Sequence, residues 1–248
     1  MAEYQMTLKH RERIARDTMA FSFDTNGTRY EFRAGQHADF LFLDPPLEQE
    51  GDNSRTFSLA NSPHDKGLVM IALRMRETGF KTALKTAALG AKFRVSRPRG
   101  PFTLHKDVTR PAVFLAGGIG ITPVRSILHW AAHERLPQKL YLFYSNRDLE
   151  DTAFLEELEG LAAQNRCFTL IPTLTRLKSP GWPYENGHID QGLLTRYLQG
   201  LDGPMYYVAG PSGMVGAMTA LLHRSGVSDD DIKTEEFGDY QQGISARP

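Results

Sequence analysis

The sequence contains a single cysteine, Cys167. A disulfide within these residues would need a second cysteine, and a cysteine-ligated iron–sulfur cluster would need about four, so both are excluded. The 8 histidines include no HExxH or similar pair, so the sequence does not indicate a metal site. Any redox chemistry would therefore depend on an organic cofactor.

Long apolar runs and a net charge are also missing. No stretch reaches the ~18 consecutive apolar residues of a membrane-spanning helix, and Lys9, Arg11 and Arg16 interrupt the N-terminal segment, which does not fit a signal peptide. The 29 Lys and Arg residues balance 29 Asp and Glu residues, so no overall field attracts nucleic acid or anionic lipid. We therefore expect a cytoplasmic protein that binds neither nucleic acid nor membrane.

Short apolar runs separated by turn signals fill the first hundred residues. Asn26-Gly27, Pro45-Pro46 and Lys66-Gly67 are typical turn dipeptides. The pattern predicts an antiparallel β-barrel with one short helix at 81–87. Its strands are expected at 4–11, 18–23, 38–43, 55–58, 68–74 and 92–96.

The pattern changes after Arg110-Pro111, where buried apolar runs alternate with amphipathic helical periodicity. Strands are expected at 112–116, 139–144, 167–172 and 205–209, helices at 122–133, 151–163 and 211–225, and an exposed loop at 176–187. This alternation predicts a Rossmann-like parallel sheet with crossover helices. We thus expect a two-domain protein, with an N-terminal β-barrel at 1–108 and a C-terminal α/β domain with a tail at 109–248.

Two glycine turns follow strands of the predicted parallel sheet. The first contains Gly117, Gly118 and Gly120 and leads through Thr122 and Pro123 into a helix. The second contains Gly210, Pro211 and Met214. Backbone N–H groups of such turns can approach a pyrophosphate closely, although a tight turn without a ligand is the alternative. The first turn is not GxGxxG, and no acidic residue ends the next strand, so a plain dehydrogenase is disfavoured.

Two further motifs lie in the predicted barrel. In Arg55-Thr56-Phe57-Ser58, the arginine could neutralise a diphosphate, the phenyl ring could cover an aromatic ring and the serine could hydrogen-bond a ring nitrogen. In Gly79-Phe80-Lys81-Thr82, a helix N-terminus and Lys81 could hold another part of the diphosphate. An ordinary strand and a capped helix are the alternatives.

These motifs, in this order and spacing, resemble the ferredoxin-NADP reductase family over nearly the whole chain. The resemblance implies that the barrel binds FAD, with FMN as an alternative, and that the second domain binds NADPH or NADH. It assigns Ser58 and Ala209 to the catalytic centre, although many relatives have a cysteine where Ala209 stands. The residues that match the family's cofactor motifs are Arg55, Phe57, Ser58, Gly79, Thr82, Gly117, Gly118, Gly120, Thr122, Pro123, Gly210, Pro211 and Met214, and Gly100-Pro101-Phe102 is similar to the segment that closes its barrel.

Three residues after predicted strands bear on the choice of dinucleotide. Arg147 and the Thr175-Arg176 pair could recognise the 2′-phosphate of NADPH, which modestly favours NADPH over NADH. Near the end of the sequence, Glu236 is a candidate proton donor and Phe237 a candidate flavin contact, in a segment similar to the family's terminal Glu-x-Phe. Solvated surface charge is the alternative for all of these charged residues.

The resemblance implies that hydride passes from NAD(P)H to the flavin N5 and that electrons then reach a ferredoxin, a flavodoxin or a similar acceptor. A reductase of free flavin, of ferric chelates or of a partner oxygenase is the enzymatic alternative. A redox-sensing flavin-binding module without turnover is the non-enzymatic one. A docking face for an acidic carrier could be formed by basic residues of the barrel, namely Arg74, Arg76, Lys81, Lys85, Arg97 and Arg99.

Overall fold

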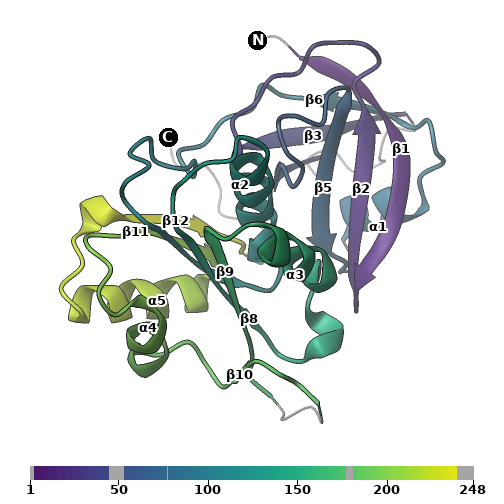
Figure 1. Ribbon diagram of the computed structural model, residues 1–248. Helices are drawn as coiled ribbons and strands as arrows, with labels where there is room; N and C mark the ends of the chain where they lie inside the picture. Colours follow the sequence, from purple (N-terminus) through teal and green to yellow (C-terminus); the bar gives the residue numbers. More distant parts are fainter. Residues whose placement is uncertain (1–2, 45–52, 77, 177–180, 239–248) are drawn as a thin grey trace, which may run out of the picture.

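Strands dominate the first half of the chain in the computed structural model, which describes residues 3–44, 53–76, 78–176 and 181–238. Six strands form one antiparallel sheet in the order β4-β3-β6-β1-β2-β5 (Figure 1). A short helix, α1 (Gly79–Thr86), lies between the last two strands in sequence. The strands are β1 (Tyr4–Ala15), β2 (Thr18–Asp24), β3 (His37–Asp44), β4 (Ser54–Ser58), β5 (Leu68–Arg74) and β6 (Lys92–Val95).

This sheet curls so that its two ends meet. In Figure 1, β3 and β6 cross the direction of β1, β2 and β5. The N–H of Ala60, just after β4, donates to the carbonyl of Met70 in β5 at 2.7 Å, and the Asn61 amide bonds to the same strand. Alternate residues of the strands point inward and enclose an aromatic core. Phe21, Phe23, Phe40, Phe42, Phe80 and Phe93 are buried there.

The second half forms a six-stranded parallel sheet in the order β10-β9-β8-β7-β11-β12. Helices α2 and α3 cover one face of this sheet, and α4 and α5 cover the other (Figure 1). The strands are β7 (Ala112–Gly117), β8 (Leu140–Asn146), β9 (Phe168–Leu174), β10 (Glu185–Asn186), β11 (Met205–Gly210) and β12 (Ile232–Glu236). The helices are α2 (Ile121–His133), α3 (Leu155–Gln164), α4 (Gln191–Leu198) and α5 (Ser212–Arg224), with short 3₁₀ turns η1 (Gly118–Gly120), η2 (Leu149–Asp151) and η3 (Asp229–Asp231).

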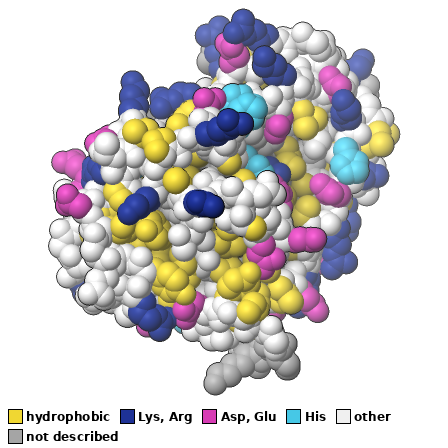
Figure 2. Space-filling view, viewed as in Figure 1, with side chains coloured by type: hydrophobic (Ala, Val, Ile, Leu, Met, Phe, Trp, Pro, Cys, Tyr) yellow, Lys and Arg dark blue, Asp and Glu magenta, His cyan; other side chains and the backbone are white. Residues whose placement is uncertain are grey.

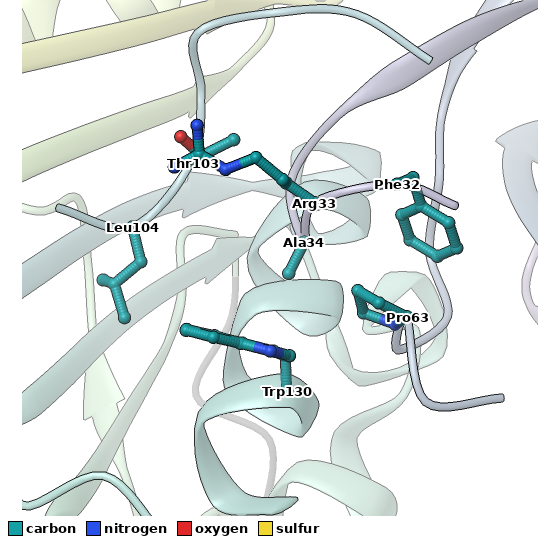
Figure 3. Close-up of a pocket in the computed structure, with 7 residues that line it drawn as sticks. All are labelled: Phe32, Arg33, Ala34, Pro63, Thr103, Leu104 and Trp130. Carbon is teal, nitrogen blue, oxygen red and sulfur yellow. The ribbon is translucent and has the colours of Figure 1, made fainter. Parts of the chain in front are cut away.

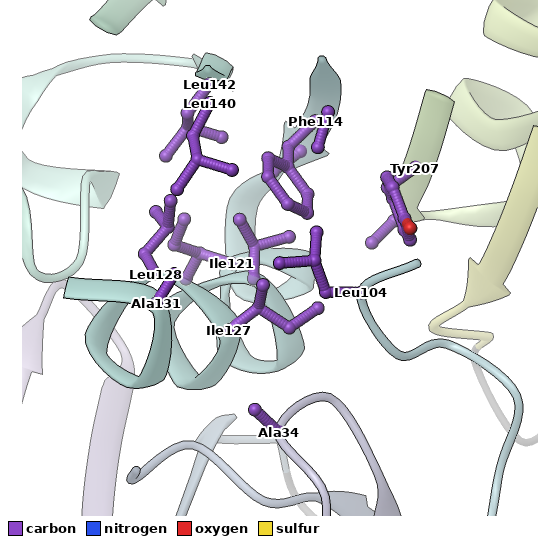
Figure 4. Close-up of a cluster of buried hydrophobic side chains, with 14 of the residues drawn as sticks. Ala34, Leu104, Phe114, Ile121, Ile127, Leu128, Ala131, Leu140, Leu142 and Tyr207 are labelled. Carbon is purple, nitrogen blue, oxygen red and sulfur yellow. The ribbon is translucent and has the colours of Figure 1, made fainter. Parts of the chain in front are cut away.

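Helix α2 packs against both halves of the molecule. Its residues Ile121, Ile127 and Leu128 contact the buried face of β7 and β8, as Figure 4 shows. Ala34, from the loop before β3, joins the same cluster from the N-terminal domain. The cores of the two domains therefore meet at α2.

Polar contacts add to this interface. The Arg125 Nη1 atom of α2 donates to the Ala60 carbonyl at 2.6 Å, and Ser126 Oγ donates to the Asn61 carbonyl at 2.6 Å. Ile119 and Phe154 pack on a small apolar cluster on the outer surface of the barrel. The carboxyl edge of the parallel sheet is thereby held against the end of β4.

The predicted fold class, an antiparallel barrel followed by a Rossmann-like parallel sheet, is confirmed. Helix α3 begins later than the predicted 151–163, because Phe154 adopts a left-handed φ of 60° that breaks the helical path. Strands β10 and β12 and helix α4 were not predicted. The predicted loop at 176–187 contains β10, while its residues 177–180 and the Pro45-Pro46 turn lie outside the described residues.

The domain boundary at 108/109 remains a prediction.

Among the described residues, no helix combines the length and the hydrophobicity that a membrane span requires.

Candidate functional site

Ser58 and Glu235 meet where the two domains face each other. Ser58 ends β4 and is buried, and its hydroxyl donates a hydrogen bond to the Glu235 carboxylate of β12. Glu235 pairs in register with Ala209 on the neighbouring strand β11. The structure therefore brings together Ser58 and Ala209, both predicted to be catalytic, around a carboxylate that the prediction did not include.

Glu235 is set apart from Glu236 by its environment. Burial raises the pKa of Glu235 to about 7, and the hydrogen bond from Ser58 opposes this shift only in part. Consecutive residues of a strand point to opposite faces, so Glu236 is exposed on the other side of β12. The predicted proton donor Glu236 thus does not face Ser58; the adjacent residue does.

The remaining residues of β4 divide between its two faces. Thr56 Oγ1 donates to Asp39 at 2.5 Å, and Arg99 binds the same carboxylate at 2.7 Å, so Thr56 serves the barrel itself. Phe57 is half-buried and packs edge-on against Phe40, with ring centroids 6.0 Å apart. Its partial exposure leaves part of the ring available to stack on a planar ligand.

The start of α1 lies beside Phe57. The Phe57 and Phe80 ring centroids are 5.7 Å apart, and Gly79, just before Phe80, is exposed. Thr82 is also exposed, so this turn faces solvent, and Thr78 caps it: the Thr78 side chain accepts from the Lys81 N–H at 3.4 Å, and the Thr78 carbonyl accepts from the Thr82 N–H at 2.9 Å. Lys81 Nζ instead donates to the Arg74 carbonyl at 2.8 Å.

The two glycine turns of the parallel sheet interlock. A Cβ on Gly120 would lie 2.3 Å from the Ala209 carbonyl oxygen, and a Cβ on Gly117 would lie 2.2 Å from Met214 Sδ. Gly210 closely approaches the backbone of Gly117. Because the contact at Gly120 is to backbone, that glycine is required by the packing of one turn on the other, whereas the contact at Gly117 is to the end of a flexible side chain.

Gly118 differs from the other glycines of this turn. Its φ is +53°, and a Cβ there would have no atom within 4 Å. The open space over a glycine turn at the carboxyl edge of a parallel sheet is suited to a dinucleotide phosphate. Thr122 and Pro123 lie below it and are buried, and Thr122 Oγ1 donates to the Ile119 carbonyl at 3.0 Å.

The residues predicted to select the dinucleotide lie further along the same edge. Arg147 and Arg176 are both exposed, and the Arg176 N–H donates to the Arg147 carbonyl at 3.0 Å. The Thr175 N–H bonds in the same way to Asn146 at 2.9 Å. The two loops that carry these residues are therefore held side by side.

Pro211 and Phe237 complete the set of predicted residues. Pro211 is the exposed N-cap of α5. The Phe237 N–H donates to the Gly210 carbonyl at 2.9 Å, and its half-buried ring packs against the core of the parallel sheet. Residues 239–248 of the predicted tail lie outside the described residues.

A cavity of about 130 Å³ lies between the domains, apart from the residues described above. It is lined mainly by apolar side chains from the barrel, from the segment before β7 and from α2 (Figure 3). None of the predicted site residues lines it.

Across the residues that the structure describes, no group of three or more His, Cys, Asp or Glu side chains is arranged to hold a metal ion.

The predicted basic docking face is partly occupied by contacts within the chain. Arg74 binds Asp151 at 3.5 Å, Lys81 binds the Arg74 carbonyl, and Arg99 binds Asp39. Lys85 and Arg97 are exposed. On the face shown in Figure 2, Lys and Arg side chains lie mainly along the upper and outer edges, interspersed with acidic ones.

Two family models match separate parts of the chain. A family model described as an oxidoreductase FAD-binding domain matches residues 5–104, and one described as an oxidoreductase NAD-binding domain matches residues 114–220. The first match contains Arg55, Phe57 and Ser58, and the second contains both glycine turns. The two matches account for most of the chain.

Individual relatives share both domains. The phenol hydroxylase P5 protein of Acinetobacter pittii (strain PHEA-2) is 30% identical over 220 residues, covering 88% of this chain and 61% of the relative. A component of the Na(+)-translocating NADH-quinone reductase of Shewanella denitrificans is 28% identical over 221 residues, covering 82% and 53%. The chain therefore spans between about half and three fifths of the length of these relatives.

Solved structures share the fold. A cytochrome P450 reductase from Amycolatopsis has a TM-score of 0.82 at 23% identity, covering 96% of this chain and 70% of the other. Phthalate dioxygenase reductase has a TM-score of 0.74 at 22% identity, covering 97% and 70%. At these identities the likeness shows a common architecture.

Proposed function

Because this chain belongs to the two-domain oxidoreductases in which an FAD-binding domain precedes an NAD-binding domain, we propose that it transfers hydride from NAD(P)H to FAD and then delivers electrons to an acceptor protein. The observation that carries this proposal is the contact of Ser58 with Glu235 across the domain junction. It joins the flavin motif of one domain to the carboxyl edge of the other, where a nicotinamide ring would lie.

The described residues fit FAD. Arg55 and the first turn of α1 would hold its diphosphate, and the partly exposed Phe57 ring would pack against the isoalloxazine. When bound, FAD supplies the chemistry of accepting a hydride and releasing its electrons one at a time. The open Gly118 turn would accept the dinucleotide phosphates.

Ser58 and Glu235 supply the polar chemistry at this junction. The Ser58 hydroxyl donates to Glu235 and keeps that carboxylate beside the flavin motif. With a pKa of about 7, Glu235 is protonated in a substantial fraction of molecules at neutral pH. It can therefore hold or release a proton when the charge beside it changes.

The acceptor that we favour is a component of an oxygenase system. A ferredoxin or a flavodoxin outside such a system is the alternative. The names of the relatives support this choice, since they include a phenol hydroxylase component, a cytochrome P450 reductase and a dioxygenase reductase.

The direct test is anaerobic stopped-flow spectroscopy of the FAD-loaded protein mixed with NADPH or NADH. We expect rapid bleaching of the flavin absorbance band and a faster reaction with NADPH. A flavin-loaded protein that neither nucleotide bleaches would contradict the proposal and would favour the redox-sensing module. A protein that does not take up FAD or FMN would overturn the flavoprotein assignment itself.

A further inference from the structure

Arg16 of the barrel domain forms ion pairs with an acidic loop of the nucleotide-binding domain. Arg16 follows β1, and its side chain reaches the loop between β8 and α3. Its guanidinium contacts Asp148, Asp151 at 3.0 and 3.1 Å and Glu150 at 3.1 Å, and its N–H donates to the Glu150 carbonyl at 2.7 Å. We call these contacts the carboxylate clasp.

The gripped loop adjoins the residues that would select the dinucleotide. Arg147 stands directly before Asp148, and its carbonyl accepts from the Arg176 N–H. The positive charge of Arg176 also favours the ionised form of the Asp148 carboxylate. The clasp therefore lies at the carboxyl edge of β8 and β9, where the adenosine ribose of a dinucleotide binds in sheets of this kind.

The charge of this loop is unfavourable for NADPH. Residues 147–151 contain one arginine and three carboxylates, and a 2′-phosphate brings further negative charge to the same edge. Left alone, the carboxylates would repel the phosphate and would compete for Arg147 and Arg176. Arg16 binds all three carboxylates and thereby offsets this repulsion.

The clasp also engages Asp148, the first carboxylate after β8. Asp148 Oδ1 accepts from the Asp151 N–H at 3.1 Å as the cap of η2, while Arg16 binds Oδ2. An acidic residue at this edge is the usual partner of an unphosphorylated ribose. Because both oxygens of Asp148 are occupied, it is poorly placed for that role.

From this arrangement we propose that Arg16 is a positioning residue that sets a preference for a 2′-phosphorylated nucleotide, by holding three carboxylates away from the 2′-phosphate. The barrel domain then controls a specificity that the other domain is expected to express. This inference rests on the proposed dinucleotide site and adds which residue determines its selectivity.

The test is calorimetric binding of two nucleotide fragments, 2′,5′-ADP and 5′-AMP, to the FAD-loaded protein. In Arg16→Gln we expect the affinity for 2′,5′-ADP to fall about tenfold and the affinity for 5′-AMP to change less than about twofold. Arg16→Lys retains the charge without the planar fork and should lie between the two. Arg13→Gln, at an exposed position near the end of β1, is the matched control and should leave both affinities unchanged.

A second variant separates charge from structure. Adding Asp148→Asn to Arg16→Gln should restore most of the affinity for 2′,5′-ADP, because asparagine keeps the cap of η2 but removes a repelling charge. An equal loss for both fragments in Arg16→Gln, or no rescue by Asp148→Asn, would overturn the inference and leave Arg16 as an interface residue. If the unaltered protein bound neither fragment, the dinucleotide site itself would fail, whereas binding without a 2′-phosphate preference would overturn the inference alone.

Discussion

Burial disfavours the charged form of the Glu235 carboxylate. The folded protein binds its proton more tightly than the unfolded chain does, because the pKa rises from 4.5 to about 7 on folding. Stability linked to this group is therefore fully present below about pH 4.5 and is lost as the pH rises to about 7. Above that window the buried charge costs about 3 kcal/mol.

We accordingly predict that Glu235→Gln stabilises the flavin-free protein at pH 8 by up to about 3 kcal/mol and has little effect at pH 4.5. A glutamine can still accept the Ser58 hydrogen bond but does not ionise. Urea unfolding at a series of pH values measures the difference. The matched control is Glu236→Gln on the opposite face of β12, which should leave the pH dependence unchanged. Equal effects of the two substitutions would show that Glu235 is not buried as described.

The same pair explains what sequence reasoning could and could not reach at the scale of residues. The four residues of the Arg55-Thr56-Phe57-Ser58 motif are consecutive, so their resemblance to a family motif could be recognised without a structure. Choosing between Glu235 and Glu236 depends on the phase of a strand, which is set by pairing with β11 and not by the residues themselves. Lys233, Glu235 and Phe237 share one face only once that register is known.

At the scale of elements, the two glycine turns behave as one unit. Gly120 of η1 lies against the backbone of Ala209 and Gly210 at the end of β11. Because both contacts are to backbone atoms, no side chain can move aside to make room. The carboxyl ends of β7 and β11 therefore fix each other.

We predict that Gly120→Ala lowers the free energy of unfolding by about 2 to 3 kcal/mol, since its Cβ would lie 2.3 Å from a carbonyl oxygen. Gly213→Ala, in the first turn of α5, places its Cβ in open space and should stabilise the protein by up to about 1 kcal/mol. Thermal unfolding of both variants gives the comparison. A mild effect of Gly120→Ala would mean that the two turns can separate.

Two of the elements that prediction missed have weak sequence signals, each for its own reason. Strand β12 reads Ile-Lys-Thr-Glu-Glu, and such charge is typical of an edge strand rather than of a buried one. Helix α4 has an Asp190 cap, whose carboxylate accepts from the Leu193 N–H at 2.7 Å, but Gly192 in its first turn weakens the helical signal. The core strands of both sheets were predictable because their apolar residues follow the burial that the strands need.

At the scale of the whole molecule, Arg125 is one of the residues that link the two domains. It donates to the Ala60 carbonyl, pairs with Glu157 at 2.7 Å and lies over the Phe154 ring at 4.7 Å. Its side chain is largely buried, with 12% exposed. Removing its charge would leave the half-buried Glu157 without its arginine partner.

We predict that Arg125→Met lowers the free energy of unfolding by about 2 kcal/mol, because Glu157 is partly solvated and keeps its contact with His129, so that the full cost of an unpaired buried charge does not apply. The loss should also separate one calorimetric transition into two, as the domains unfold more independently. Arg29→Met, in an exposed pair with Glu31, should change stability by less than about 0.5 kcal/mol. A single unshifted transition in Arg125→Met would show that the other contacts between the domains couple them without Arg125.

The contact between Ser58 and Glu235 spans 177 residues of sequence. Domains generally fold in order as the ribosome releases them, so the barrel can form while Glu235 has yet to be synthesised. A nascent chain that stalls before β12 would then display the flavin motif without its carboxylate partner. Assembly of the proton-holding pair therefore waits until the strand that carries Glu235 has been synthesised and has joined the sheet.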